Sequence, residues 1–199
     1  MFSKEKIVEL AGEEKIIKYS QELCKKKFLD QETKYILEKL GVPQSASPYI
    51  TFLEEDSGAM SKLNSYYDLS IYEQLGNMNI SKERFNEVIV CFQKYIVLGN
   101  LENGVFVLNE KYQVIQIDNE TLEEYYINQT LDAFLESLLV YKRIIYEVQG
   151  RYTEIVFFDE YITEKDIEKL KIRLLNIDEH SLDDNSFWFS EIESLEERF

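Results

Sequence analysis

The longest stretch of helical periodicity lies at residues 128–145, which read NQTLDAFLESLLVYKRII. Its apolar side chains recur every three or four residues, as they do on one face of a helix. These side chains are Leu131, Phe134, Leu135, Leu138, Tyr141 and Ile145, and Leu139 and Val140 widen the face. Asn128 or Thr130 is placed to cap the first turn. The pattern predicts a helix that turns this band towards the core, with an exposed binding groove as the alternative.

Four short apolar runs precede this helix, and loops of hairpin length separate them. The runs cover residues 94–99, 104–109, 112–118 and 122–128. Connections as short as NLEN and EK join neighbouring antiparallel strands. The sequence therefore predicts an antiparallel meander. A shorter alternating run, YITFLEED at 49–56, predicts a further strand that ends in a polar turn.

Four more helices are predicted from apolar spacing and from residues that begin or end a helix. They cover residues 13–28, 29–43, 163–178 and 186–197. Their expected N-caps are Asp30, Thr163 with Asp166 three residues later, and Ser186. Gly41 stands where a left-handed C-cap is favoured, and Pro43 prevents the helix from continuing. The expected inward residues of the last two helices are Ile167, Leu170, Leu174, Leu175, Phe187, Trp188, Ile192 and Leu195.

The tyrosine-rich stretch 59–88 has no steady period, and its interpretation stays open between short strands and a surface loop. The 199 residues contain no linker, repeat or low-complexity tract. We therefore expect a single domain over residues 1–199. Its predicted fold class is α+β, with a central antiparallel meander sheet and helices packed around it.

Charge narrows the range of partners. The chain has 38 acidic and 22 basic residues, a net charge of −16, so it repels nucleic acid and anionic membranes and attracts a basic partner. Cys24 and Cys91 are far apart, have apolar neighbours and form no Cys-x-x-Cys pair, which indicates a reducing compartment. No apolar run approaches the ~18 residues of a membrane span. These features predict a cytoplasmic protein with no membrane and no nucleic-acid partner.

The chain offers little chemistry for catalysis. His180 is the lone histidine and lies in the polar turn DEHSLDD, so a zinc site has no ligand set. The stretch GNLENG at 99–104 lacks the Lys-Ser/Thr of a phosphate loop, and EEDSGAMSK at 54–62 lacks the spacing of a calcium loop. Paired carboxylates lie on polar turns and polar helix faces. The sequence therefore predicts no catalytic residue, no cofactor and no metal.

The most distinctive charged feature is the C-terminal segment from Asp178 to Glu197, which holds eight acids and no Lys or Arg. It follows the predicted helix at 163–178 and contains the aromatic pair Phe187-Trp188. A solvated helix face is one interpretation. The other is a surface that meets a basic partner, and its predicted partner-binding residues are Asp178, Glu179, Asp183, Asp184 and Glu191.

Four segments, in this order, carry a resemblance to a known family. They read KYILEKLGVP, YIVLGNLENGVFVLNEKYQVIQID, INQTLDAFLESLLVYKRI and IDEHSLDDNSFWFSEIESLE. Their signatures are a helix ending in Leu-Gly-x-Pro, a strand ending at Gly99 before a hairpin, Asn128 and Thr130 ahead of an apolar helix, and Phe187-Trp188 before an acidic helix. This order resembles the SUKH superfamily of immunity proteins and is most similar to its fourth subfamily. It covers residues 28–199 and leaves 1–27 as an N-terminal helical extension.

The resemblance implies a SUKH-like α+β fold and a role in a bacterial toxin system. Such a protein would bind one cognate toxin domain, for example a nuclease, and block it without catalysis. No toxin-contacting residue transfers, because these interfaces diverge with each toxin. The NQT before the apolar helix departs from the family's two small hydroxyl residues, which alters a helix cap. Two alternatives stay open: a non-enzymatic regulatory or scaffold module of the same fold, and an enzyme that uses surface carboxylates.

Overall fold

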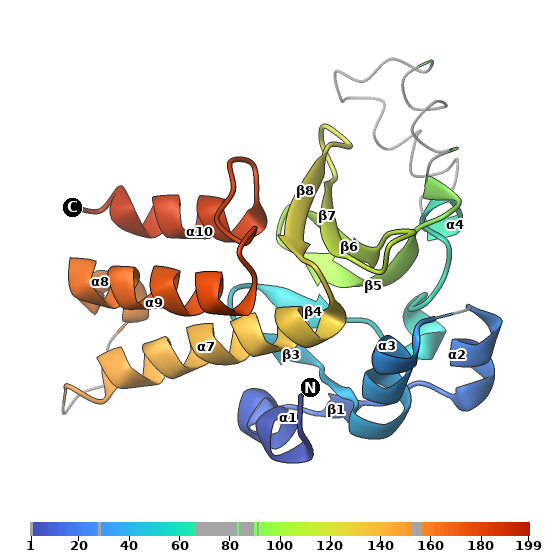
Figure 1. Cartoon of the computed structure of the whole chain (residues 1–199), viewed down its shortest axis with the longest axis horizontal. Coiled ribbons are helices and arrows are strands. Elements are labelled where there is room, and N and C mark those ends of the chain that lie inside the picture. Colours follow the sequence, from blue (N-terminus) through green and yellow to red (C-terminus); the bar gives the residue numbers. More distant parts are fainter. Residues whose placement is uncertain (1, 28, 67–82, 84–89, 91, 153–156) are drawn as a thin grey trace.

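The computed structural model describes residues 2–27, 29–66, 83, 90, 92–152 and 157–199. Six strands form one antiparallel sheet in the order β3-β4-β5-β6-β7-β8, with helices around it (Figure 1). These strands are β3 (Ser45–Ala46), β4 (Ile50–Phe52), β5 (Ile96–Leu101), β6 (Gly104–Leu108), β7 (Val114–Asp118) and β8 (Glu124–Asn128). The predicted α+β architecture, the meander of β5 to β8 and the additional strand β4 are confirmed.

Both faces of the central strands are buried, which explains why they read as continuous apolar runs. Almost every residue of β5 and β6 is inaccessible. One face packs on the long helix α7 (Leu131–Gln149). The other face meets Leu63 of α4 (Leu63–Tyr66) and Phe92. The sheet is therefore a middle layer.

Gly99 has a structural reason to lack a side chain. The register of β5 against β6 shifts between Val97 and Gly99. A Cβ atom at position 99 would lie 2.2 Å from the carbonyl oxygen of Thr51 and 2.4 Å from the ring of Phe106. Only glycine permits this close approach of β4 to β5.

The apolar band of α7 faces the core, as predicted. Leu131, Phe134, Leu135, Leu138, Leu139 and Tyr141 are all buried, and Val140 and Ile145 are partly buried. The ring centroid of Phe134 lies 5.5 Å from that of Phe106 and 6.2 Å from that of Phe52. Thr130 is the N-cap, because its Oγ1 accepts a hydrogen bond of 3.1 Å from the Ala133 N–H. The exposed-groove alternative for this helix is excluded.

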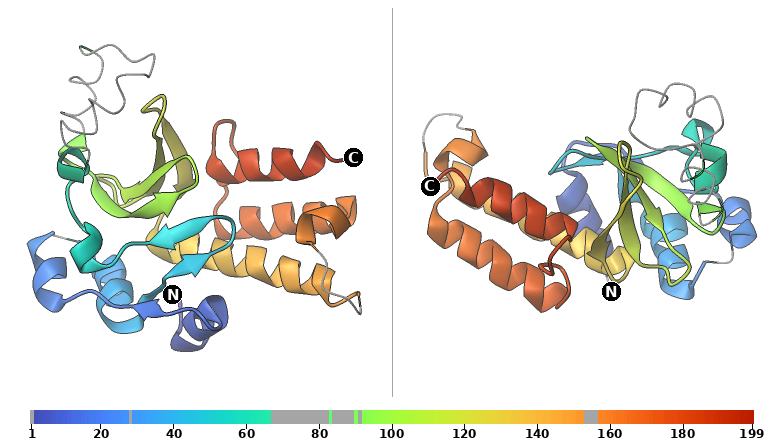
Figure 2. Two further views of the ribbon diagram at one scale, coloured as in Figure 1. Left: turned by 180° about the vertical axis from the view of Figure 1, so that it is seen from behind. Right: turned by 90° about the horizontal axis from the view of Figure 1, so that it is seen from above.

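The C-terminal half of α7 extends beyond the sheet and packs against other helices (Figure 2). These are α8 (Phe158–Tyr161) and α9 (Glu164–Ile177). The last helix, α10 (Phe187–Glu196), packs on α9, and its Trp188 ring lies 5.9 Å from the Tyr141 ring of α7. Thr163 and Asp166 form the predicted capping box, which Arg151 reinforces by pairing with the Asp166 carboxylate. Ser186 caps α10 as predicted. The expected inward residues are buried except Leu175, whose inward assignment is wrong: it is exposed on the outer side of α9.

The N-terminal region contains less helix than predicted. The prediction of a helix over residues 13–28 is wrong in its first half, because Ile16–Ile17 form strand β1 and pair with β2 (Val42–Pro43). Helix resumes as α2 (Gln21–Lys26) after the Ser20 N-cap. The β-branched isoleucines gain backbone hydrogen bonds in this pairing that a sequence period does not reveal. Upstream, α1 (Lys4–Ala11) packs on α7, and Ile7 and Leu10 join the same core.

The predicted helix over 29–43 forms with a change of winding. Asp30 accepts hydrogen bonds of 2.9 Å from two backbone N–H groups and caps α3 (Gln31–Tyr35). A π-helical turn, η1 (Ile36–Leu40), follows, and Gly41 ends it with a φ of 87°. A short 3-10 turn, η2 (Glu55–Ser57), follows β4. The open stretch 59–88 is described only at 59–66 and 83, and Cys91 lies outside the described residues.

Candidate functional site

The five acids predicted to meet a partner lie in three different environments. Asp178 follows the end of α9 and is only 2% exposed. Glu179, Asp183 and Asp184 belong to the loop between α9 and α10, and all three are exposed. Glu191 lies on α10 and is partly buried. Burial thus separates Asp178 from the charges that solvent or a partner can reach.

The carboxylate of Asp178 is held by four hydrogen-bond donors. Its Oδ2 accepts from the Tyr126 hydroxyl at 2.7 Å and from the Gln129 N–H at 2.8 Å. Oδ2 also accepts from Nδ2 of Asn128 at 3.2 Å, and Oδ1 accepts from the His180 N–H at 3.1 Å. A buried carboxylate is stable when donors satisfy it in this way. Asp178 therefore fastens the start of the α9–α10 loop to β8.

Asn128 extends this network into the core. It is fully buried at the end of β8, and its Oδ1 accepts a 3.0 Å hydrogen bond from the indole N–H of Trp188. Its Nδ2 donates to Ser137 of α7 at 3.3 Å as well as to Asp178. One asparagine thus connects β8, α7, α10 and the end of α9. Sequence reasoning missed this role because Asn128 and Trp188 are 60 positions apart, and the only local signal was a polar residue beside a helix start.

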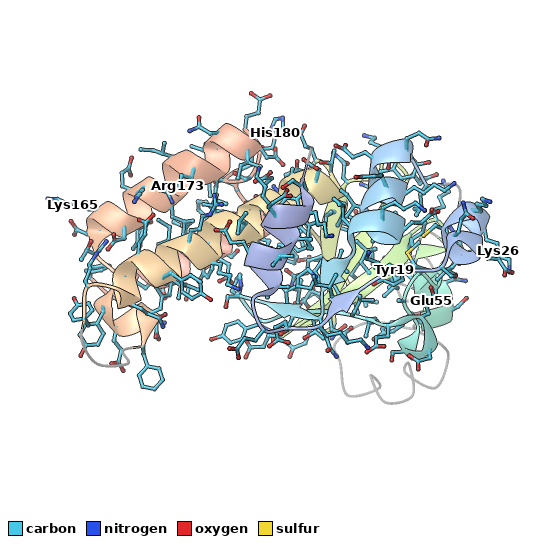
Figure 3. The ribbon with its side chains drawn as sticks, turned by 90° about the horizontal axis from the view of Figure 1, so that it is seen from below. Tyr19, Lys26, Glu55, Lys165, Arg173 and His180 are labelled. Carbon is cyan, nitrogen blue, oxygen red and sulfur yellow. The ribbon has the colours of Figure 1, made fainter. Side chains whose placement is uncertain are left out.

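Two exposed acids of the α9–α10 loop, Glu179 and Asp183, lie beside His180, which points outward beyond the end of α9 (Figure 3). Its Nδ1 lies 2.9 Å from Oδ2 of Asp183, and Glu179 is more distant at 4.0 Å. The hydrogen bond and the negative charge of Asp183 raise the pKa of His180. As pH falls, the imidazolium therefore neutralises part of this acidic loop.

Glu191 faces a hollow of about 270 Å³ between α10, the β5–β6 hairpin and the residues before β4. Its lining includes three carboxylates, Glu102, Asp118 and Glu191, and no Lys, Arg or His. Burial raises the pKa of Glu191 to about 7, and the charge of Glu102 adds to the effect. Asp118 is occupied by the backbone N–H groups of its own turn.

A second hollow, of about 580 Å³, lies between α1, the β3–β4 hairpin and α7. Its apolar side includes Leu10, Ala46 and Ile145. Tyr49 and Glu102 line both this hollow and the one beside Glu191. The two hollows are therefore neighbours that share the side chains of Tyr49 and Glu102.

The described residues that line the hollow beside Glu191 do not form an assembled nucleophile–base pair. A carboxyl of raised pKa beside an ordinary one resembles a general acid–base pair. However, the Ser190 hydroxyl in the same hollow donates to the Ser186 carbonyl oxygen, and no lining histidine or lysine could activate it. Among the residues that the structure describes, no three His, Cys, Asp or Glu side chains come together as metal ligands. Within the same residues, no helix has the length and hydropathy that crossing a bilayer requires.

Comparison with known protein families adds one match. The model of the family described as SUKH-4 immunity protein matches residues 2–194. This range includes the N-terminal helix, the sheet, α7 and most of α10. No curated protein and no solved structure matches the chain.

Proposed function

This chain belongs to the SUKH-4 immunity protein family, and from that premise we propose that it binds one cognate toxin domain in a stoichiometric complex. Immunity proteins of this family neutralise a toxin. The family match over residues 2–194 is the observation that carries the proposal. The proposed action is binding without catalysis, as membership of an immunity protein family implies.

The proposed partner is a basic domain, such as a nuclease, met in the bacterial cytoplasm. A net charge of −16 supports this choice, because opposite charges accelerate encounter between proteins. Acidic side chains would also compete with the nucleic acid that such a toxin binds. The buried free thiol of Cys24 fits a reducing compartment.

The proposed acidic contact surface consists of Glu179, Asp183, Asp184 and Glu191. The first three are exposed on the α9–α10 loop, and Glu191 is accessible through its hollow. Asp178 would act indirectly, because it holds the loop in place through the hydrogen bonds to β8.

Co-expression with the C-terminal domain that the adjacent gene encodes, the candidate toxin, tests the function. We expect this protein to restore growth and to co-purify with that domain in a fixed ratio. Toxicity that persists, with no complex formed, would contradict the immunity function and favour the alternative of a regulatory or scaffold module.

The acidic surface has its own test in the double variant Asp183→Lys with Asp184→Lys. We expect a slower association rate with the toxin domain, a weaker dependence of that rate on salt, and a stability within about 1 kcal/mol of the wild type. The control is Glu120→Lys with Glu160→Lys, two exposed acids on other elements that change the net charge equally. Equal on-rates for the loop variant and the wild type would place the interface elsewhere.

A further inference from the structure

One large side chain of this protein is exposed without any visible benefit to the fold. Tyr49 immediately precedes β4 and is 73% exposed, a value that only Phe157 equals among the described large hydrophobic residues. Exposed aromatic side chains are common centres of protein–protein binding energy, because a rigid ring buries much area at little entropic cost.

The backbone at Tyr49 is strained. Its φ is 48°, in the left-handed region that favours Gly or Asn and disfavours a bulky side chain. The residue follows Pro48 in the short connection between β3 and β4, and the Ala46–Ile50 pairing closes this hairpin. A tyrosine in a strained turn that contributes little to the core points to a role outside folding.

The surface beside Tyr49 is shaped for a partner. The lining of the hollow of about 580 Å³ on the α1–α7 side combines apolar side chains with Glu14 and Lys142, and it includes Tyr146, which is 58% exposed. The hollow of about 270 Å³ on the α10 side is polar and acidic. A partner that covers Tyr49 can therefore fill both hollows.

Charge selects the occupant of the acidic hollow. Glu102 and Glu191 have no cationic partner among the described residues, and no basic side chain lines the hollow. A Lys or Arg side chain entering there would pair with these carboxylates and pass over the face of the Tyr49 ring, where cations are attracted.

We propose that the face around Tyr49 is the docking site for the toxin domain, with Tyr49 as its aromatic anchor and a basic side chain of the toxin between Glu102 and Glu191. This inference rests on the proposed immunity function and specifies its interface. The toxin would then contact two regions of this protein, the acidic α9–α10 loop and the face around Tyr49, and α10 connects them.

The test measures binding of the toxin domain encoded by the neighbouring gene to four proteins: the wild type, Tyr49→Ala, Tyr49→Phe and Phe157→Ala. We expect Tyr49→Ala to weaken Kd by about 30-fold or more, as truncation of an aromatic hot spot does. Tyr49→Phe keeps the ring and should retain most of the affinity. Phe157→Ala is the matched control, since Phe157 is equally exposed but precedes α8, and should bind like the wild type.

Thermal melts of all four proteins should coincide within a few degrees, because neither ring is buried. Wild-type affinity in Tyr49→Ala, or an equal loss in Phe157→Ala, would overturn the docking site and leave the immunity function intact. Absence of binding by the wild type itself would overturn the proposed function and the docking site with it.

Discussion

Replacing Asp178 with alanine should destabilise the whole protein, although the residue lies in an acidic segment beside an exposed loop. The carboxylate is buried and accepts four hydrogen bonds, from Tyr126, Asn128, Gln129 and His180. Alanine removes both acceptor oxygens and leaves these donors without them. The loop would lose its attachment to β8, and α10 depends on that loop for its position.

The magnitude follows from which donors can reach water. Nδ2 of Asn128 is fully buried, and an orphaned buried donor costs about 1–3 kcal/mol. The other three donors are part-buried and can form hydrogen bonds to water instead, so the loss of each of these bonds costs about 0.5 kcal/mol. The sum is about 3 kcal/mol, a substantial part of the 5–15 kcal/mol that stabilises a typical domain.

Denaturant unfolding followed by tryptophan fluorescence measures this effect. Trp188 is the single tryptophan of the chain, it is fully buried, and its indole N–H binds Asn128 in the same network. We expect a lower midpoint for Asp178→Ala and a shift of the native emission towards the red, because the indole loses part of its surroundings.

The matched control is Asp184→Ala, which removes an exposed carboxylate six positions further along the same segment. Its unfolding free energy should stay within about 0.5 kcal/mol of the wild type. If both variants fall within about 1 kcal/mol of the wild type, the reasoning that Asp178 holds the segment to the sheet is refuted.

Two further predictions concern the core and the acidic hollow. Phe134→Ala should cost about 3–5 kcal/mol, because the ring is fully buried against Phe52 and Phe106; a thermal melt that hardly moves would contradict this assignment. The pKa of Glu191 is raised from 4.5 to about 7 in the folded protein, so between these pH values the native state binds more protons than the unfolded state. The wild type therefore loses stability as pH rises from 4.5 to 7. Glu191→Gln removes this titration, and its free energy of unfolding should exceed that of the wild type by up to about 3 kcal/mol near pH 8 and differ little near pH 5. A gain in denaturant unfolding that does not depend on pH would contradict the raised pKa of Glu191.

Local signals in the sequence were sufficient where the structure is decided by neighbours along the chain. The meander of β5 to β8 joins strands through short loops, and the caps at Asp30, Thr163 and Ser186 each act within three residues. The apolar spacing of the α7 band correctly indicated a helix whose band faces the core. These features depend on side-chain period and on backbone groups a few residues away, so the sequence alone determined them.

Tertiary structure decided what depends on residues distant in the sequence. Ile16–Ile17 form a strand because β2 lies beside them. Asp178 is buried because Tyr126 and Asn128 of β8 donate hydrogen bonds to its carboxylate. Tyr49, Glu102 and Glu191 come from three separate elements and share one hollow. The period of apolar residues indicates which face of an element is buried, and a cap indicates where a helix begins. The raised pKa of Glu191 and the exposure of Tyr49 depend instead on which distant parts of the chain the fold places beside them.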